Sequence, residues 1–202
     1  SIKPGTKIKG STYYTITNNT IRSNIGILMG GTISNTTSPT HITIGNVDAT
    51  NTPTLNATYT NRFDYLNIGI NNVNGKVNVY NNQFSNMITL STGTAVGAVC
   101  HTSFFGGYAS TKIGALGGGS SPSSFFKNVF GPSCSGIIQD GVTAVGGGSL
   151  DVSYNDFCTI SRYGVNVKSW NAPVASSHTV LVSNNSFSTT SYAFYAYNNQ
   201  TI

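Results

Sequence analysis

The sequence predicts an all-β protein wound as a solenoid of stacked parallel coils, and three observations support this fold class. Six short segments share one pattern, in which an asparagine stands two residues before an apolar side chain. They recur roughly every 20 to 30 residues, a spacing typical of solenoids. Only 7% of the residues are charged, against about 25% in an average soluble domain. Asn, Ser and Thr are abundant, and their side chains disfavour helices by bonding to the local backbone.

The length and charge of the chain restrict its class further. Its 202 residues are enough for one domain with a core, so we expect a single β-helix domain over 1–202. The net charge is +5, but apart from Lys3, Lys7 and Lys9 the basic residues are scattered, which argues against nucleic-acid binding. No run of about 18 apolar residues is present, so no membrane span is expected.

The six asparagine segments lie at 16–21, 59–63, 79–84, 126–130, 152–157 and 182–187. Stacked coils bring equivalent side chains into columns about 4.8 Å apart, and an amide carries both donors and acceptors. We therefore expect an internal asparagine ladder, with a serine filling one slot between Asn82 and Asn128. The expected members are Asn19, Asn61, Asn82, Ser103, Asn128, Asn155 and Asn185.

A second column follows the ladder, in which a small residue precedes an alternating strand. It comprises the segments 26–28, 69–71, 136–138, 164–166 and 193–195. Each coil should thus hold at least two strands with a turn between them.

The remaining segments are expected to be loops or a degenerate coil. Residues 41–46 would form that coil within an irregular region at about 35–58, and Gly/Ser-rich loops are expected at about 106–123 and 144–149. The total is then about seven to eight coils. The motif at 80–83 reappears at 197–200, which suggests another repeat and a fragment of a longer chain.

This pattern resembles the right-handed parallel β-helix repeat family, with its pectin-lyase-like folds and asparagine ladder. The resemblance covers nearly the whole chain and implies a right-handed, single-stranded parallel β-helix. That family includes polysaccharide lyases, glycoside hydrolases, phage tailspikes, adhesins and bacterial surface proteins, and fold alone does not choose among them.

The acidic residues argue against catalysis. The chain has five, all Asp, and no two of them share a clear column. Hydrolase relatives need a carboxylate pair, and a calcium site needs several carboxylate oxygens. We therefore expect no catalytic residues, no metal and no cofactor. Cys100, Cys134 and Cys158 show no zinc spacing, and one disulfide among them stays open.

One outward-facing group is a candidate for glycan contact. Aligning the small residues Gly136 and Gly164 places Asp140 beside Lys168 on successive coils, with aromatic residues nearby. The alternative is a solvated ion pair without a ligand. The candidate residues are Asp140, Lys168, Trp170, Tyr195 and Tyr197.

These expectations favour a structural or adhesive segment of a secreted or cell-surface bacterial protein. Its partners would be a polysaccharide or other cell-surface glycan and further coils or domains of the parent chain, because a solenoid needs capped ends. The alternatives are a polysaccharide lyase or glycoside hydrolase, and a viral tailspike segment.

Overall fold

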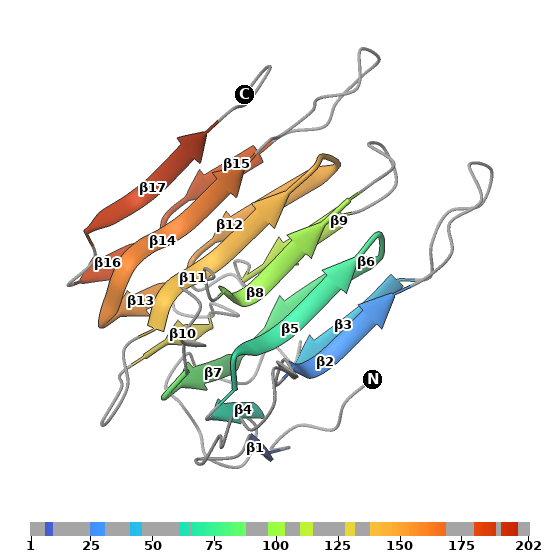
Figure 1. Ribbon diagram of the computed structural model, residues 1–202, viewed down its shortest axis with the longest axis horizontal. Helices are drawn as coiled ribbons and strands as arrows, with labels where there is room; N and C mark the ends of the chain where they lie inside the picture. Colours follow the sequence, from blue (N-terminus) through green and yellow to red (C-terminus); the bar gives the residue numbers. More distant parts are fainter. Residues whose placement is uncertain are drawn as a thin grey trace, which may run out of the picture.

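The strands of the protein stack in chain order along one axis, from β2 and β3 to β17 (Figure 1). This computed structural model describes residues 7–9, 25–30, 41–45, 61–64, 66–87, 97–103, 110–114, 128–131, 138–168, 180–188 and 191–197. Within these ranges all regular structure is β-strand and all strand pairs are parallel, which confirms the predicted parallel β-helix.

Three sheets form the walls of the solenoid, and each takes every third strand along the chain. The first sheet contains β1 (Lys7–Lys9), β4 (Asn61–Asp64), β7 (Asn82–Ser85), β10 (Val129–Phe130), β13 (Asp156–Cys158) and β16 (Ser186–Ser188). The second sheet contains β2 (Ile25–Gly30), β5 (Ile68–Val73), β8 (Gly97–Thr102), β11 (Ile138–Val145), β14 (Ile160–Lys168) and β17 (Tyr192–Tyr197). The third sheet contains β3 (His41–Gly45), β6 (Lys76–Tyr80), β9 (Ser110–Ile113), β12 (Ser149–Ser153) and β15 (Val180–Ser183).

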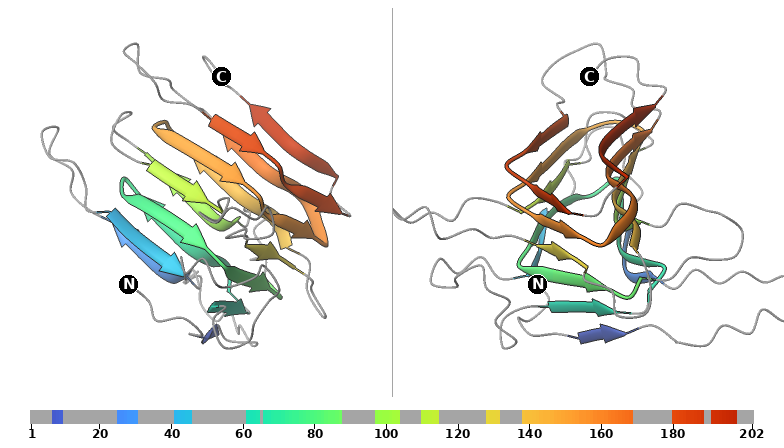
Figure 2. Two further views of the ribbon diagram at one scale, coloured as in Figure 1. Left: turned by 180° about the vertical axis from the view of Figure 1, so that it is seen from behind. Right: turned by 90° about the vertical axis from the view of Figure 1, so that its left-hand side faces the viewer.

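One strand from each sheet makes a coil, so the described strands form six coils, the last of which has only β16 and β17. Figure 2 shows the first and last coils at opposite ends of the stack. Seven to eight coils were predicted for the whole chain because 41–46 was counted as a degenerate coil of its own and Ser103 as the ladder position of another. Residues 41–45 instead form β3, which pairs with β6 as the third strand of the first coil, and Ser103 follows β8 within the third coil.

The predicted ladder residue Asn19 lies outside the described residues; among the described strands, the neighbour of β4 is β1, with Lys7 opposite Arg62. The predicted equivalence of the motifs at 80–83 and 197–200 is wrong. Tyr197 ends β17 of the second sheet, whereas Tyr80 ends β6 of the third. The motifs that begin there are therefore not equivalent, and residues 198–200 lie outside the described ranges.

The predicted loops are only partly loops. The region 106–123 contains β9, which pairs with β6 and β12. In 144–149, the turn between β11 and β12 passes through Gly146, whose φ is +98°. A side chain at Gly146 would place its Cβ 1.9 Å from the carbonyl oxygen of Ser103, so this close crossing of two coils requires glycine.

The asparagine ladder is present at Asn61, Asn82, Asn128, Asn155 and Asn185. The Nδ2 of each donates to the Oδ1 of the next, at 3.0, 3.0, 2.9 and 3.0 Å in chain order. From Asn82 on, the backbone N–H of a ladder residue also donates to the next Oδ1, as Asn82 does to Asn128 at 3.0 Å. The amides are thus satisfied by their neighbours in a region that excludes water, as buried polar groups must be.

Ser103 does not belong to the ladder. It follows β8 at the turn between the second and third sheets, where its N–H donates to the carbonyl of Val145 at 3.0 Å. In the ladder, Asn82 bonds directly to Asn128. The coil that begins at β7 continues through β8 and β9, and the next coil begins at β10, directly after Asn128.

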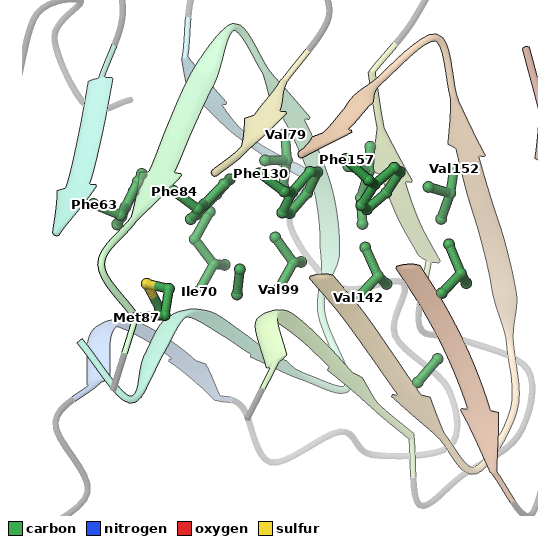
Figure 3. Close-up of a cluster of buried hydrophobic side chains, with 14 of the residues drawn as sticks. Phe63, Ile70, Val79, Phe84, Met87, Val99, Phe130, Val142, Val152 and Phe157 are labelled. Atoms are coloured by element: carbon green, nitrogen blue, oxygen red, sulfur yellow. The ribbon is translucent and has the colours of Figure 1, made fainter. Parts of the chain in front are cut away.

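A column of phenylalanines runs beside the ladder, each two residues after a ladder asparagine (Figure 3). Their rings stack with centroid separations of 4.8, 5.0, 4.5 and 4.8 Å through Phe63, Phe84, Phe130, Phe157 and Phe187. Ile70, Val99 and Val142 of the second sheet pack against this column. The apolar residue two places after each ladder asparagine therefore points into the solenoid.

Small residues of the second sheet make room for this stack. A Cβ on Gly141 would lie 2.6 Å from the Phe157 ring, and one on Gly164 would lie 2.3 Å from the Phe187 ring. Val142 is opposite Val165, so Gly141 and not Gly136 is the partner of Gly164. This corrected register changes the neighbours of Asp140.

Candidate binding surface

Four tyrosines gather on the outer face of the second sheet at the C-terminal end of the stack. Tyr163 of β14 is opposite Tyr192 of β17, Asn166 is opposite Tyr195, and Lys168 is opposite Tyr197. Asn166 and Lys168 alternate with the core residues Val165 and Val167, so their partners Tyr195 and Tyr197 face outward. The rings of Tyr163 and Tyr192 contact the ring of Tyr195 and therefore lie on the same face. We call Tyr163, Tyr192, Tyr195 and Tyr197 the tyrosine patch.

The rings of the patch are in contact with one another. Tyr163 stacks on Tyr195 with centroids 4.6 Å apart, and it meets Tyr192 at 5.7 Å with a tilt of 38°. Tyr195 lies 6.1 Å from Tyr192 and 6.5 Å from Tyr197. Tyr192 and Tyr197 are 57% and 55% exposed, so the patch offers aromatic surface to solvent.

A buried ion pair borders the patch. Both carboxylate oxygens of Asp140 accept from Arg162, from Nε and Nη2 at 2.8 Å each. Asn166 Nδ2 and Thr143 Oγ1 donate to the same carboxylate at 3.0 and 3.1 Å. The Asp140 side chain is fully buried, whereas that of Arg162 is 34% exposed.

The ion pair fixes the position of Arg162 on the patch. Its Cζ lies 4.8 Å from the centroid of the Tyr163 ring, within cation–π range. The hydrogen bonds to Asp140 raise the pKa of Arg162 above its ordinary value, although burial opposes this. Asp140 thus holds the guanidinium, and both of its carboxylate oxygens accept hydrogen bonds within the protein.

The structure places the predicted candidate residues as follows. Lys168 and Tyr197 are register partners, and Tyr195 is opposite Asn166. Asp140 is not beside Lys168: it is buried opposite Tyr163, because Gly141 occupies the small-residue column. Lys168 has no ion-pair partner within the described part of the chain. Trp170 lies outside the described residues.

Other acidic residues are isolated from this surface. Asp151 pairs with Lys112 at 3.7 Å on the third sheet and also accepts from Ser153. Asp64 accepts from Asn86 Nδ2 at 2.8 Å on the first sheet. Among the described residues there is no group of three or more His, Cys, Asp or Glu side chains that could hold a metal ion.

His101 lies inside the solenoid and is fully hydrogen-bonded. Its Nε2 donates to the carbonyl of Gly147 at 2.7 Å, so its Nδ1 accepts from the Thr111 hydroxyl at 2.6 Å. Asn72 Nδ2 in turn donates to Thr111 Oγ1 at 3.0 Å. Burial lowers the pKa of His101, and the Gly147 bond opposes this only in part. The imidazole is therefore a neutral structural group.

The cysteines offer no reactive site among the described residues. Cys100 and Cys158 are free, and burial raises the pKa of the Cys100 thiol to about 12. At neutral pH this thiol is protonated, and the thiol form is a poor nucleophile. Cys134 lies outside the described residues.

Comparison with known proteins found no matching family model, curated protein or solved structure. The described residues contain no helix long and apolar enough to span a membrane.

Sequence reasoning missed Tyr163, Tyr192 and Arg162 as members of this surface. A signal for the two tyrosines is present in the sequence, because each directly precedes a small residue of the second column, Gly164 or Ala193. Arg162 could not be found in this way, because its partner Asp140 belongs to the neighbouring coil and their register depends on a shift between β11 and β14.

Proposed function

We propose that this chain is a structural, adhesive β-helix segment that binds glycan through the tyrosine patch. The observation that carries the proposal is the gathering of four tyrosines on two paired strands, with Lys168 beside Tyr197 and Arg162 over Tyr163. We place the protein outside the cell or on its surface, as part of a larger assembly that presents the rod.

The chemistry of the patch suits sugar rings. Tyrosine combines a flat apolar ring with a polar hydroxyl, so the ring can cover the apolar face of a sugar while the hydroxyl bonds to a neighbouring sugar oxygen. Lys168 and Arg162 add N–H donors for oxygen acceptors. The exposed rings of Tyr192 and Tyr197 give such a ligand direct access.

The rigidity of the support favours binding. Tyr192, Tyr195 and Tyr197 all lie on β17, which pairs with β14 along its length. A site on strands holds its geometry better than a site on loops, and less ordering is then required when a ligand binds.

The state of Asp140 favours a binding role over hydrolysis. Hydrolysis of a glycosidic bond ordinarily requires an acid and a second carboxylate on either side of the bond. Asp140 is the carboxylate beside the patch, and it is buried and bonded to Arg162, Asn166 and Thr143.

The test is a binding screen of purified protein against immobilised glycans, followed by titration of each hit. Replacing Tyr195 or Tyr197 by alanine should weaken the affinity about two- to thirteenfold, the effect of losing roughly 0.5 to 1.5 kcal/mol of aromatic contact. The matched control is Leu181→Ala, which removes an exposed apolar side chain from the third sheet. Equal affinities for all three variants and the parent protein would refute the proposal that the tyrosine patch is the glycan-binding site.

Two measurements distinguish the alternative functions from adhesion. Release of reducing ends or unsaturated products from these glycans would favour a polysaccharide lyase or glycoside hydrolase of the pectin-lyase-like type. A trimer in light scattering would favour a tailspike segment. Glycan binding without product release, by a protein that is not a trimer, supports adhesion.

A further inference from the structure

We propose that the tyrosine patch is a site of oxidative cross-linking, in which a dityrosine bond between Tyr163 and Tyr192 joins β14 to β17. This inference does not depend on glycan binding. It rests on the positions of the rings, their exposure and the place of β17 in the fold.

The two tyrosines are held side by side by the backbone. Tyr163 and Tyr192 are register partners on adjacent parallel strands, where the strands run about 4.8 Å apart. Their ring centroids are 5.7 Å apart with a tilt of 38°. A modest rotation of Tyr192, which is 57% exposed, can bring the edges of the two rings together.

Tilt and separation together distinguish this pair from the others in the patch. Tyr192 and Tyr195 are also tilted, by 54°, but their centroids are farther apart, at 6.1 Å. Tyr163 and Tyr195 lie face to face, with an interplanar angle of only 16°, so the ring edges that must bond point in parallel directions. Tyr195 and Tyr197 are the most widely separated pair, at 6.5 Å. These three pairs are therefore less suited to an edge-to-edge bond.

The reaction requires a one-electron oxidant, for which a haem peroxidase with hydrogen peroxide is the chemical class. Each tyrosine loses one electron to the oxidant and its hydroxyl proton to water. The two phenoxyl radicals then form one carbon–carbon bond between the ring carbons next to their oxygens. A ring hydrogen on each of those carbons moves, through water, to the oxygen and restores the hydroxyl. Overall, two tyrosines lose two hydrogen atoms and one peroxide becomes two waters.

The bond would secure the last described coil. In the sheet order, β17 has β14 on one side and no strand on the other among the described residues. Tyr192 and Phe194 of β17 are exposed, so little burial holds this strand in place. A covalent link to β14 closes a loop in the unfolded chain and so favours the folded state.

The experiment is oxidation of dilute protein with peroxidase and peroxide, followed by dityrosine fluorescence, intact mass and peptide mapping. We expect a monomer lighter by two hydrogen atoms, with the link between the peptides that contain Tyr163 and Tyr192. Its urea unfolding midpoint should exceed that of the untreated protein.

The variants Tyr163→Phe and Tyr192→Phe should each abolish this link, because phenylalanine has no hydroxyl to oxidise. The control Tyr154→Phe, at a bend between β12 and β13, should keep it. A link that persists in either patch variant, a link that maps elsewhere, cross-linked dimers alone or no link would each overturn the proposal. No glycan is used in this experiment, so the absence of a dityrosine bond leaves the glycan-binding proposal standing. Equally, the absence of glycan binding leaves the cross-linking proposal standing.

Discussion

At the scale of single residues, the ladder asparagines join successive coils through several hydrogen bonds each. Asn155 illustrates this: its Oδ1 accepts from the N–H and Nδ2 of Asn128 at 3.1 and 2.9 Å. Its Nδ2 donates to the carbonyls of Ile113 and Ser153 and to Asn185 Oδ1, at 2.9, 3.0 and 3.0 Å. One amide therefore connects three coils and the turn backbone.

The substitution Asn155→Ala should lower the free energy of unfolding by about 2 to 4 kcal/mol, because each buried group left unpaired costs about 1 to 3 kcal/mol. Urea denaturation followed by circular dichroism measures this. The control Asn78→Ala, on the outer side of β6 and partly exposed, should change stability by less than about 0.5 kcal/mol. Equal losses for the two variants would contradict the structural role of the ladder.

His101 should make stability depend on pH. Its folded pKa is lowered by burial, so as the pH falls the unfolded chain takes up the proton first, near the ordinary value of about 6.5. The stabilising contribution is complete above that pH and declines as the pH falls below it.

Urea midpoints at about pH 8 and about pH 5 measure this dependence. The parent protein should lose more stability between the two pH values than His101→Gln, which cannot titrate at this position. His41 and His178 are common to both proteins, so their titration cancels in the comparison. An identical pH dependence in the two proteins would show that His101 does not contribute.

At the scale of elements, the phenylalanine stack and the small residues of the second sheet fit each other. Gly69, Gly141 and Gly164 each face a phenylalanine ring at a distance where a Cβ would collide. Ala98 fills the corresponding position of β8 and is fully buried. The spacing between the first and second sheets is therefore set by a large ring facing a small residue.

The substitution Gly141→Ala should destabilise the protein by about 1 to 3 kcal/mol, the usual cost of overpacking a core. Phe157→Leu should relieve part of that cost, because the Phe157 ring is the nearest group that the new Cβ would meet, at 2.6 Å, ahead of the Gly164 carbonyl oxygen at 2.9 Å. A double-mutant cycle by chemical denaturation measures the coupling. If the two effects simply add, the ring is not the obstacle.

The elements were predictable to different degrees. The position of β7 follows from its local pattern, because Asn82 and Phe84 stand in one short segment. The position of β11 relative to β14 did not follow from a local pattern, because Gly136 and Gly141 both match the small-residue pattern. Only the register that places Val142 opposite Val165 distinguishes the two glycines. The predicted alignment of Gly136 with Gly164 therefore gave Asp140 the wrong partner.

At the scale of the whole molecule, the solenoid is buried in its middle and exposed at the C-terminal end of its described part. Val142 and Ala144 of β11 are fully buried, whereas Phe194 of β17 is 40% exposed. In a stack of coils each unit is stabilised mainly by its neighbours, so stability should differ along the axis.

Hydrogen exchange followed by mass spectrometry should therefore show a gradient. Backbone amides of β11 and β12 should exchange slowly, and those of β16 and β17 much faster, because local opening requires little energy where few contacts must break. Uniform protection over all these strands would mean that the solenoid opens only as a whole.

The sequence by itself determined the columns of this protein. A ladder asparagine and the phenylalanine two residues later belong to one bend, and their repetition reports stacked coils because equivalent bends lie one above another. The tertiary structure alone decided which positions of successive coils meet, including the pairing of Asp140 with Arg162 and the gathering of the four tyrosines. The physical reason is that the connections between strands differ in length from coil to coil, so the register is fixed by packing and hydrogen bonds between coils and not by spacing along the chain.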